Sequence, residues 1–232
     1  MKKQVYAFFV ALIGVLILAT TVLAAAPKAE PPRYGGTMTF MEKYPALNPI
    51  AWDNATWVWK HAYDTGFYLE HLMMGDLQKG PRGTNQYDFK ENSWIPHLFL
   101  RGELIEKYEV KKKPMQVIFH LRKGVMWQEK PGIMKAREFV ADDVVFSMTR
   151  LRNSPKAQKE HHDFIDRWEV VDKHTLIMHM KEWDADWRYR MGWGVYDAIQ
   201  PKEMADAPGG ANKWENLLIP SMSMNLKNPI LN

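Results

Sequence analysis

The sequence predicts an α+β fold, in which helices and strands share a core without alternating regularly along the chain. Two pairs of segments with alternating polar and apolar residues, each pair joined by a short turn, indicate two β-hairpins. A segment with helical spacing separates them, and the regular strand–helix–strand order of a nucleotide-binding sheet is missing. The chain has 46% hydrophobic residues and no cysteine, so a hydrophobic core rather than disulfides must stabilise it.

The first 26 residues have the order of a secretory signal peptide. Two lysines precede an uncharged stretch over residues 5–23, and alanines at positions 24–26 are the small residues that a signal peptidase accepts. A retained membrane anchor is the alternative, because an apolar run of this length can span a bilayer. The proline-containing linker at residues 27–34 favours cleavage. We therefore expect a soluble periplasmic protein.

The mature chain is expected to open with a strand and a helix. Residues 37–41 form a short β-prone run after two glycines. Asn54 can cap a helix that extends to about Leu72, since aromatic and apolar side chains recur there at helical spacing. Residues 73–89 are rich in Gly, Asp and Asn, and we expect them to be irregular.

The two hairpins are predicted over residues 108–121 and 168–180. The basic run at residues 111–113 lies before a proline and is expected to be a solvated hairpin tip. The period of two in each second strand predicts one buried face per hairpin. The residues expected on these faces are Val117, Phe119 and Leu121 in the first hairpin and Leu176, Met178 and Met180 in the second.

A helix is predicted between the hairpins, over residues 141–151. Asp142 and Asp143 lie in its first turn, where the helix dipole favours negative charge, so we interpret them as capping residues rather than as an acid–base pair. Trp127 follows a tight turn at Gly124 and is expected to pack against the first hairpin.

Charge and motif content exclude several classes of function. The formal net charge of +4 falls to +2 when the two signal lysines are removed, which is too small for a nucleic-acid-binding protein. The motifs of serine hydrolases, zinc proteases, P-loop proteins and dinucleotide-binding proteins are missing from the sequence. We therefore expect no catalytic residue, no cofactor and no nucleic-acid partner.

A histidine-rich stretch is the strongest candidate for a metal site. His161, His162 and Asp163 are adjacent, and Asp166 follows His162 by one helical turn. Imidazole and carboxylate groups suit zinc or nickel, but a closed site needs three or four ligands that converge. We expect a solvated polar stretch without metal, and a secreted metal-dependent enzyme is the alternative.

Aromatic residues gather after the first predicted strand and again over residues 183–196. Core packing explains most aromatic side chains of this kind. Trp52 is the exception, because it lies in a predicted loop and suits the wall of an apolar cleft. Tyr44 and Asn54 flank it on the same segment, and these three are the candidate ligand-binding residues.

Two segments resemble the signature of the family 5 extracellular solute-binding proteins, which are the oligopeptide-, dipeptide- and nickel-binding proteins of ABC importers. They are residues 121–127, Leu-Arg-Lys-Gly-Val-Met-Trp, and residues 139–147, Phe-Val-Ala-Asp-Asp-Val-Val-Phe-Ser. Shorter blocks that resemble the family follow in the same order along the chain. They lie at residues 34–39, 47–49, 63–65, 170–176 and 199–202.

The resemblance implies a fold like that of type II periplasmic binding proteins. Residues 35–216 would form the first lobe with a small additional subdomain. Family members continue into a second lobe, which we expect to be missing, because residues 217–232 resemble no family element. Two further departures are a longer loop at residues 129–138 and Val140, which replaces a threonine that commonly caps the helix.

The resemblance also implies a function. We expect the periplasmic substrate-binding component of an ABC importer, which binds peptides, is a monomer and docks on permease subunits in the inner membrane. Nickel or another small solute is the alternative within the family. A single lobe contacts a solute on one side, so we do not expect tight peptide binding from this chain alone.

We predict that the exported protein is cleaved near Ala24–Ala26, because small residues there follow the uncharged stretch. N-terminal sequencing of the protein recovered from the periplasm measures the cleavage point. A membrane-bound protein that still begins with Met1 would contradict the prediction.

Overall fold

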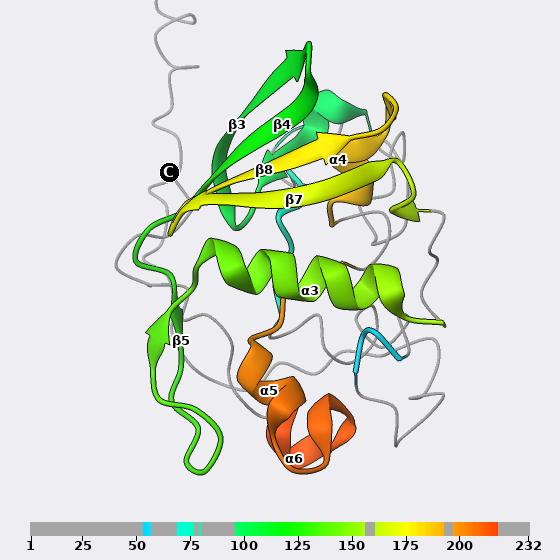
Figure 1. Ribbon diagram of the computed structural model, residues 1–232. Coiled ribbons are helices and arrows are strands. Elements are labelled where there is room, and N and C mark those ends of the chain that lie inside the picture. The colour runs from blue at the N-terminus through cyan, green and yellow to red at the C-terminus, as the bar shows by residue number, and fades with distance from the viewer. Residues whose placement is uncertain are drawn as a thin grey trace, which may run out of the picture. The chain divides into compact units, whose positions relative to one another are not determined.

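The centre of the fold is a four-stranded antiparallel sheet with one long helix packed against it (Figure 1). The computed structural model describes residues 53–56, 69–76, 79, 96–155, 161–192 and 197–217, all of which belong to one compact unit. The signal segment and the expected strand at residues 37–41 lie outside the described residues. Within the described ranges, no helix is long and apolar enough to cross a membrane.

Two hairpins form the sheet, as the sequence predicts. Strands β3 (Ile105–Lys112) and β4 (Met115–Leu121) make the first hairpin, and β7 (Ile165–Asp172) and β8 (Thr175–Met180) make the second. The strand order is β3-β4-β8-β7, so the hairpins join through an antiparallel pairing of β4 with β8. All side chains expected on the apolar faces are buried, namely Val117, Phe119, Leu121, Leu176, Met178 and Met180.

The two hairpins repeat one another in sequence and in register. Residues 106–110 (Glu-Lys-Tyr-Glu-Val) correspond to residues 166–170 (Asp-Arg-Trp-Glu-Val), and Ile-Phe-His-Leu in β4 corresponds to Ile-Met-His-Met in β8. The register aligns four residues in one row across the sheet, in the order Glu109, Ile118, Ile177 and Glu169. A half-turn about the centre of that row would exchange the two hairpins.

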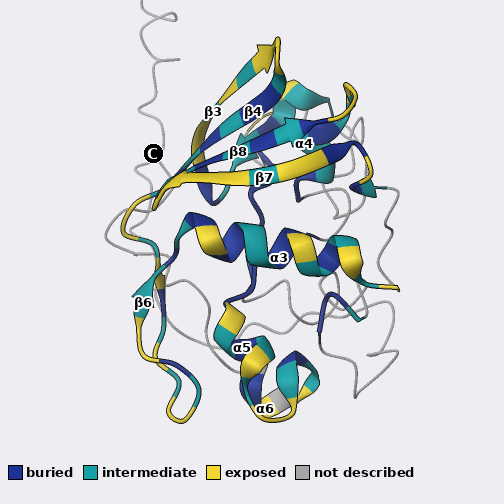
Figure 2. Cartoon of the chain, viewed as in Figure 1, coloured by how far each residue is buried: buried dark blue, intermediate teal, exposed yellow. Residues whose placement is uncertain are grey.

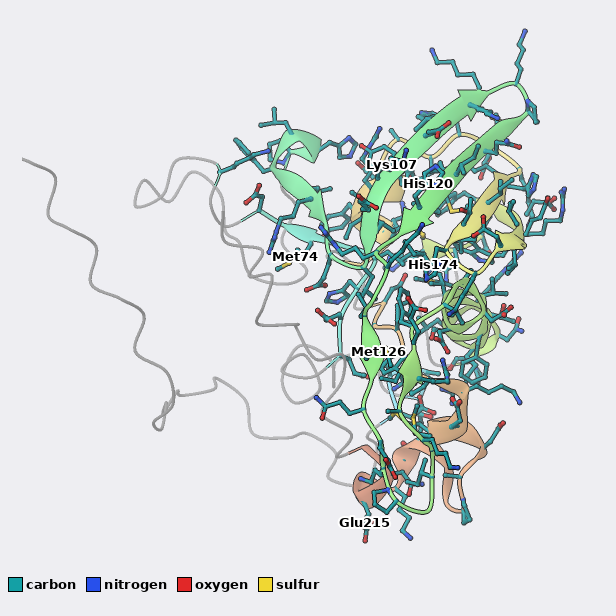
Figure 3. All side chains as sticks on the ribbon, turned by 90° about the vertical axis from the view of Figure 1, so that its left-hand side faces the viewer. Met74, Lys107, His120, Met126, His174 and Glu215 are labelled. Carbon is teal, nitrogen blue, oxygen red and sulfur yellow. The ribbon has the colours of Figure 1, made fainter. Side chains whose placement is uncertain are left out.

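Each hairpin has the same histidine–glutamate pair on the face that points away from the core. His120 Nε2 lies 3.0 Å from Glu109 Oε1, and His179 Nε2 lies 2.7 Å from Glu169 Oε2. Lys107 is the cross-strand neighbour of His120, and both are visible on the outer side of the sheet in Figure 3. The sheet is therefore built from two copies of one hairpin motif.

Helix α3 (Ala141–Asn153) begins where the sequence predicts and ends slightly later. Its buried positions recur every three or four residues, and Figure 2 shows them as dark-blue segments that recur along the helix. They are Ala141, Asp143, Val144, Ser147, Met148 and Leu151. Val145, beside these buried positions, is only half-buried.

Aromatic rings fill the space under the first hairpin. Trp187, in the short helix α4 (Trp187–Arg190), is fully buried. Its ring meets Tyr108 and Phe119 edge to face, with centroids 5.1 Å and 5.8 Å away. Trp168 lies 6.1 Å from Phe119 on the same side. Core packing thus accounts for these aromatic residues, as expected.

The sequence prediction is wrong near residue 72. Residues 69–72 are not helical, and Met73–Gly75 form strand β1, which pairs with β2 (Leu100–Gly102) after the short 3-10 helix η2 (His97–Phe99). The carbonyl of Leu72 accepts a hydrogen bond from the amide of Glu103 at 3.0 Å. Pairing with a distant segment has therefore overridden the local helical spacing. The segment 57–68 of the predicted helix lies outside the described residues.

The long loop at residues 129–138 connects the start of α3 to the helix that contains Glu203. It joins two short paired strands, β5 (Met126–Trp127) and β6 (Arg137–Glu138). Arg137 donates two hydrogen bonds to Asp143, at 2.7 Å and 2.8 Å. It donates two more to Glu203 in helix α5 (Lys202–Asp206), at 2.6 Å and 2.7 Å. The chain continues into the 3-10 helix η4 (Gly210–Asn212) and helix α6 (Trp214–Leu217).

Asp143 makes hydrogen bonds in addition to its favourable interaction with the helix dipole. Its buried carboxylate also accepts hydrogen bonds from the indole Nε1 of Trp127 at 3.0 Å and from the amide of Val140 at 3.1 Å. Val140 itself offers no side-chain cap, as expected, and Asp143 partly compensates for this. Hydrogen bonds from Arg137 hold the pKa of Glu203 below its ordinary value, although burial opposes the shift.

We predict that Trp127→Ala lowers the free energy of unfolding by about 3–5 kcal/mol, because the ring is buried against Phe139 and its Nε1 bonds to Asp143. Trp127→Phe should cost less, since it keeps most of the ring and loses the hydrogen bond. Denaturant unfolding measures both.

Trp183→Ala is the matched control, because that indole is 46% exposed and its loss should cost under about 0.5 kcal/mol. A cost below about 1 kcal/mol for Trp127→Ala would contradict the packing described above.

Candidate functional site

A groove of about 560 Å³ runs along the second half of α3. The helix forms one wall, and the turn at residues 53–56, drawn in cyan beside the helix in Figure 1, forms the other. This volume is within the range of small-molecule binding sites. The lining residues are Ala55, Thr56, Val145, Phe146, Thr149, Arg150, Asn153 and Ser154.

An ion pair fixes the turn to the helix. Arg150 Nη1 donates to Asp53 Oδ1 at 3.1 Å, and Arg150 Nη2 donates to Asp53 Oδ2. Asp53 Oδ1 also accepts from the amide of Ala55 at 3.0 Å. Ser154 Oγ donates to the carbonyl of Ala55 at the end of the helix. Polar contacts therefore join the two walls of the groove at Arg150 and again at Ser154, just after the last turn of the helix.

Two residues from the C-terminal part of the described chain support this contact. Gln200 Oε1 accepts a further hydrogen bond from Arg150 Nη1 at 3.1 Å. The side chain of Asn212 accepts from the amide of Asp53 at 3.1 Å and donates to Thr56 Oγ1 at 3.3 Å. These bonds connect segments far apart in the sequence, so the groove depends on the tertiary fold.

The lining combines an apolar floor with uncharged polar groups. Val145 and Phe146 supply the apolar surface, and the Arg150 guanidinium lies 5.6 Å from the Phe146 ring centroid, within range of a cation–π contact. Thr149 and Asn153 offer a hydroxyl and an amide on the same face of the helix. A groove of this kind suits a solute with both apolar surface and hydrogen-bonding groups.

Asn54, one of the three candidate ligand-binding residues, does not itself line this groove. Asn54 is buried in the turn, directly before Ala55, which lines the groove. Tyr44 and Trp52 lie outside the described residues. Sequence reasoning missed the residues of α3. A signal was present, because residues 145, 149 and 153 form an i, i+4, i+8 stripe beside the buried face.

The histidine-rich stretch is not the solvated polar stretch that we expected, because His162 is buried. His162 Nε2 lies 2.7 Å from Asp197 Oδ2, and both side chains are about 95% buried or more, with exposures of 5% and 3%. Asp166 is exposed and contacts Arg167 instead. No group of three or more His, Asp or Glu side chains in the described part of the chain is placed to hold a metal ion.

The pair of His162 and Asp197 favours the charged imidazole. Burial lowers the pKa of His162, but the charge and hydrogen bond of Asp197 outweigh burial, so the net pKa is above its ordinary value. Arg152 and Arg190 oppose this increase through their positive charges. The pair links the start of β7 to the segment before α5.

The family model of bacterial extracellular solute-binding proteins, family 5, matches residues 100–218, just over half of the chain. This match contains α3, both hairpins and the long loop. It corresponds to the middle region of the family.

Two curated proteins are similar to part of the chain. The dipeptide-binding protein of Escherichia coli is 46% identical over 59 residues, which are 25% of this chain and 10% of that protein. Heme-binding protein A of Haemophilus influenzae is 31% identical over 128 residues, which are 49% of this chain and 23% of that protein. The matches thus span less than a quarter of the length of either relative.

The fold also matches solved structures. The structure of HbpA2 from Haemophilus parasuis covers 69% of this chain and 31% of its own length, with 18% sequence identity and a TM-score of 0.52. The mixed α/β architecture expected from the resemblance, that of a type II periplasmic binding protein, is therefore confirmed for this part of the chain.

We predict that His162→Gln destabilises the protein more at pH 5.5 than at pH 9. A histidine with a raised pKa contributes its full stabilisation below its unfolded pKa of 6.5, and that contribution is lost as the pH rises through the folded value. The loss at pH 5.5 should be about 3 kcal/mol, because one partner of a buried pair is removed. Denaturant unfolding at both pH values measures it.

His179→Gln is the control for this measurement, since its partner Glu169 is half exposed and the pair should contribute less than about 1 kcal/mol. Equal destabilisation of the His162→Gln protein at the two pH values would show that the imidazole is neutral in the folded state.

Proposed function

The chain belongs to the bacterial extracellular solute-binding proteins of family 5, and we propose that it is the substrate-binding component of an ABC importer with a peptide as its solute. The observation that supports this function best is the groove between α3 and the turn at residues 53–56. It offers the apolar contact and the neutral hydrogen-bonding groups that a peptide requires.

The chemistry of the groove suits a peptide segment. Phe146 and Val145 can contact an apolar side chain, while Thr149 and Asn153 can exchange hydrogen bonds with main-chain amide groups. Recognition through main-chain groups places few demands on side-chain identity. The similarity to a curated dipeptide-binding protein supports the same class of solute.

Heme is the second candidate, because the longer of the two curated matches is to a heme-binding protein. Protein ligands of heme iron are usually His, Met, Cys or Tyr side chains. The eight groove-lining residues in the described part of the chain include none of these. The described part of the lining therefore gives more support to a peptide than to an iron-ligated heme.

The remaining parts of the proposal concern location and partners. We propose export to the periplasm, a monomeric state and docking on permease subunits of the inner membrane. Residues 35–216 would form the first lobe of the binding protein. A binding role without catalysis agrees with the family of solute-binding proteins and with the similarity to a dipeptide-binding protein. Nickel or another small solute is the alternative to a peptide, and titration with each solute distinguishes them.

The open groove contacts a solute on one side, so we predict weak binding of peptides by this chain. Calorimetric titration with a library of di- to pentapeptides should give dissociation constants of about 1 mM, equivalent to about 4 kcal/mol. Thr149→Trp should abolish this binding, because the indole would fill the groove beside Phe146.

Asp142→Trp is the control, since position 142 is exposed on the same helix outside the groove. Peptide binding that survives Thr149→Trp would place the solute elsewhere on the molecule. Sub-micromolar binding by the wild-type monomer would show that one side of contact is sufficient.

A further inference from the structure

Among the lining residues that the structure describes, one side chain is charged, and its charge is already compensated. Arg150 is the charged member of the eight lining residues. Asp53 binds it through both carboxylate oxygens, and Gln200 accepts a third bond from it. The side chain of Arg150 is 27% exposed and that of Asp53 is 5% exposed. A solute therefore meets the cation, whereas the anion lies behind it.

The position of Asp53 is fixed independently of any solute. Its carboxylate accepts from the amide of Ala55, and its own amide donates to Asn212. The guanidinium also lies 5.6 Å from the centroid of the Phe146 ring. A carboxylate entering the groove would thus have to compete with a buried, prearranged carboxylate for the same cation. Competition of this kind costs desolvation without a new compensating charge.

We propose that Asp53 is a specificity-determining residue, which makes the groove select uncharged, amide-bearing groups and reject carboxylates. This inference rests on the proposed function and names its solute chemistry. The groove would accept an interior segment of a peptide, with its apolar side chain on Phe146 and its amides near Thr149 and Asn153. The carboxylate terminus of a peptide would lie outside the groove.

The rejection follows from electrostatics at short range. An ion pair at a partly exposed site leaves little net field, so Arg150 attracts an added anion weakly while Asp53 repels it. Removing the charge of Asp53 would leave an uncompensated guanidinium at the wall. Arginine then becomes a strong partner for a carboxylate, because its planar fork matches both oxygens.

A matched pair of small probes tests the proposal at pH 7. N-acetylleucinamide is neutral, and N-acetylleucine has the same apolar side chain with one negative charge. NMR titration that follows the amide signals of Thr149 and Asn153 measures both dissociation constants in the millimolar range. In the wild-type chain, we expect the neutral probe to bind at least about tenfold more tightly. In Asp53→Asn, that ratio should fall to about one or reverse.

Two further variants separate charge from folding. Asp142→Asn removes one negative charge from an exposed position of the same helix and should keep the wild-type ratio. The double variant Asp53→Asn/Arg150→Gln leaves no charge unpaired and should again prefer the neutral probe. Circular dichroism of each variant reports its folded state, and the wild-type ratio decides the charge selection even where Asp53→Asn does not fold.

The outcomes distinguish this inference from the proposed function. Equal affinity of the wild-type chain for the two probes would overturn charge selection and leave peptide binding intact. An unchanged ratio in folded Asp53→Asn would overturn the role of Asp53. If neither probe shifts the signals of Thr149 or Asn153, both the inference and the groove as the binding site are overturned.

Discussion

The buried carboxylate of Asp143 is the constraint on which the arrangement of the fold depends. A buried charge is costly unless its hydrogen bonds are satisfied, and removing a partner leaves that cost uncompensated. Here the partners come from three directions: the indole of Trp127, the guanidinium of Arg137 and the amide of Val140. Because Arg137 also binds Glu203, the same charge positions the long loop, α3 and α5 together.

A second ion pair, between Arg150 and Asp53, fixes the far end of α3 to a neighbouring segment, as Asp143 fixes its start. Arg150 lies in the last turns of the helix and holds the turn at residues 53–56 through Asp53. Between these polar ends, apolar side chains such as Val144 and Met148 bury the middle of the helix. The groove lies beside this buried part of the helix and next to the second ion pair. Its lining therefore combines apolar side chains, such as Phe146, with polar ones, such as Arg150.

Local periodicity explains which parts of this structure could be predicted. The hairpins and α3 were predictable because alternation and helical spacing are properties of neighbouring residues. The strand at Met73–Gly75 was not, since it forms by pairing with a segment beyond residue 99. The candidate site follows the same rule, because the contact of Asp53 with Arg150 depends on the tertiary fold and no local pattern of residues predicts it.

The duplicated hairpin has a consequence for how the chain folds. Each hairpin closes a short loop between adjacent strands, which is fast and inexpensive in entropy. The seam between β4 and β8 is the sheet contact of long sequence separation, with Ile118 and Ile177 at its centre. We therefore expect the docking of the two hairpins along this seam, rather than the closure of either hairpin, to limit the rate at which the sheet forms.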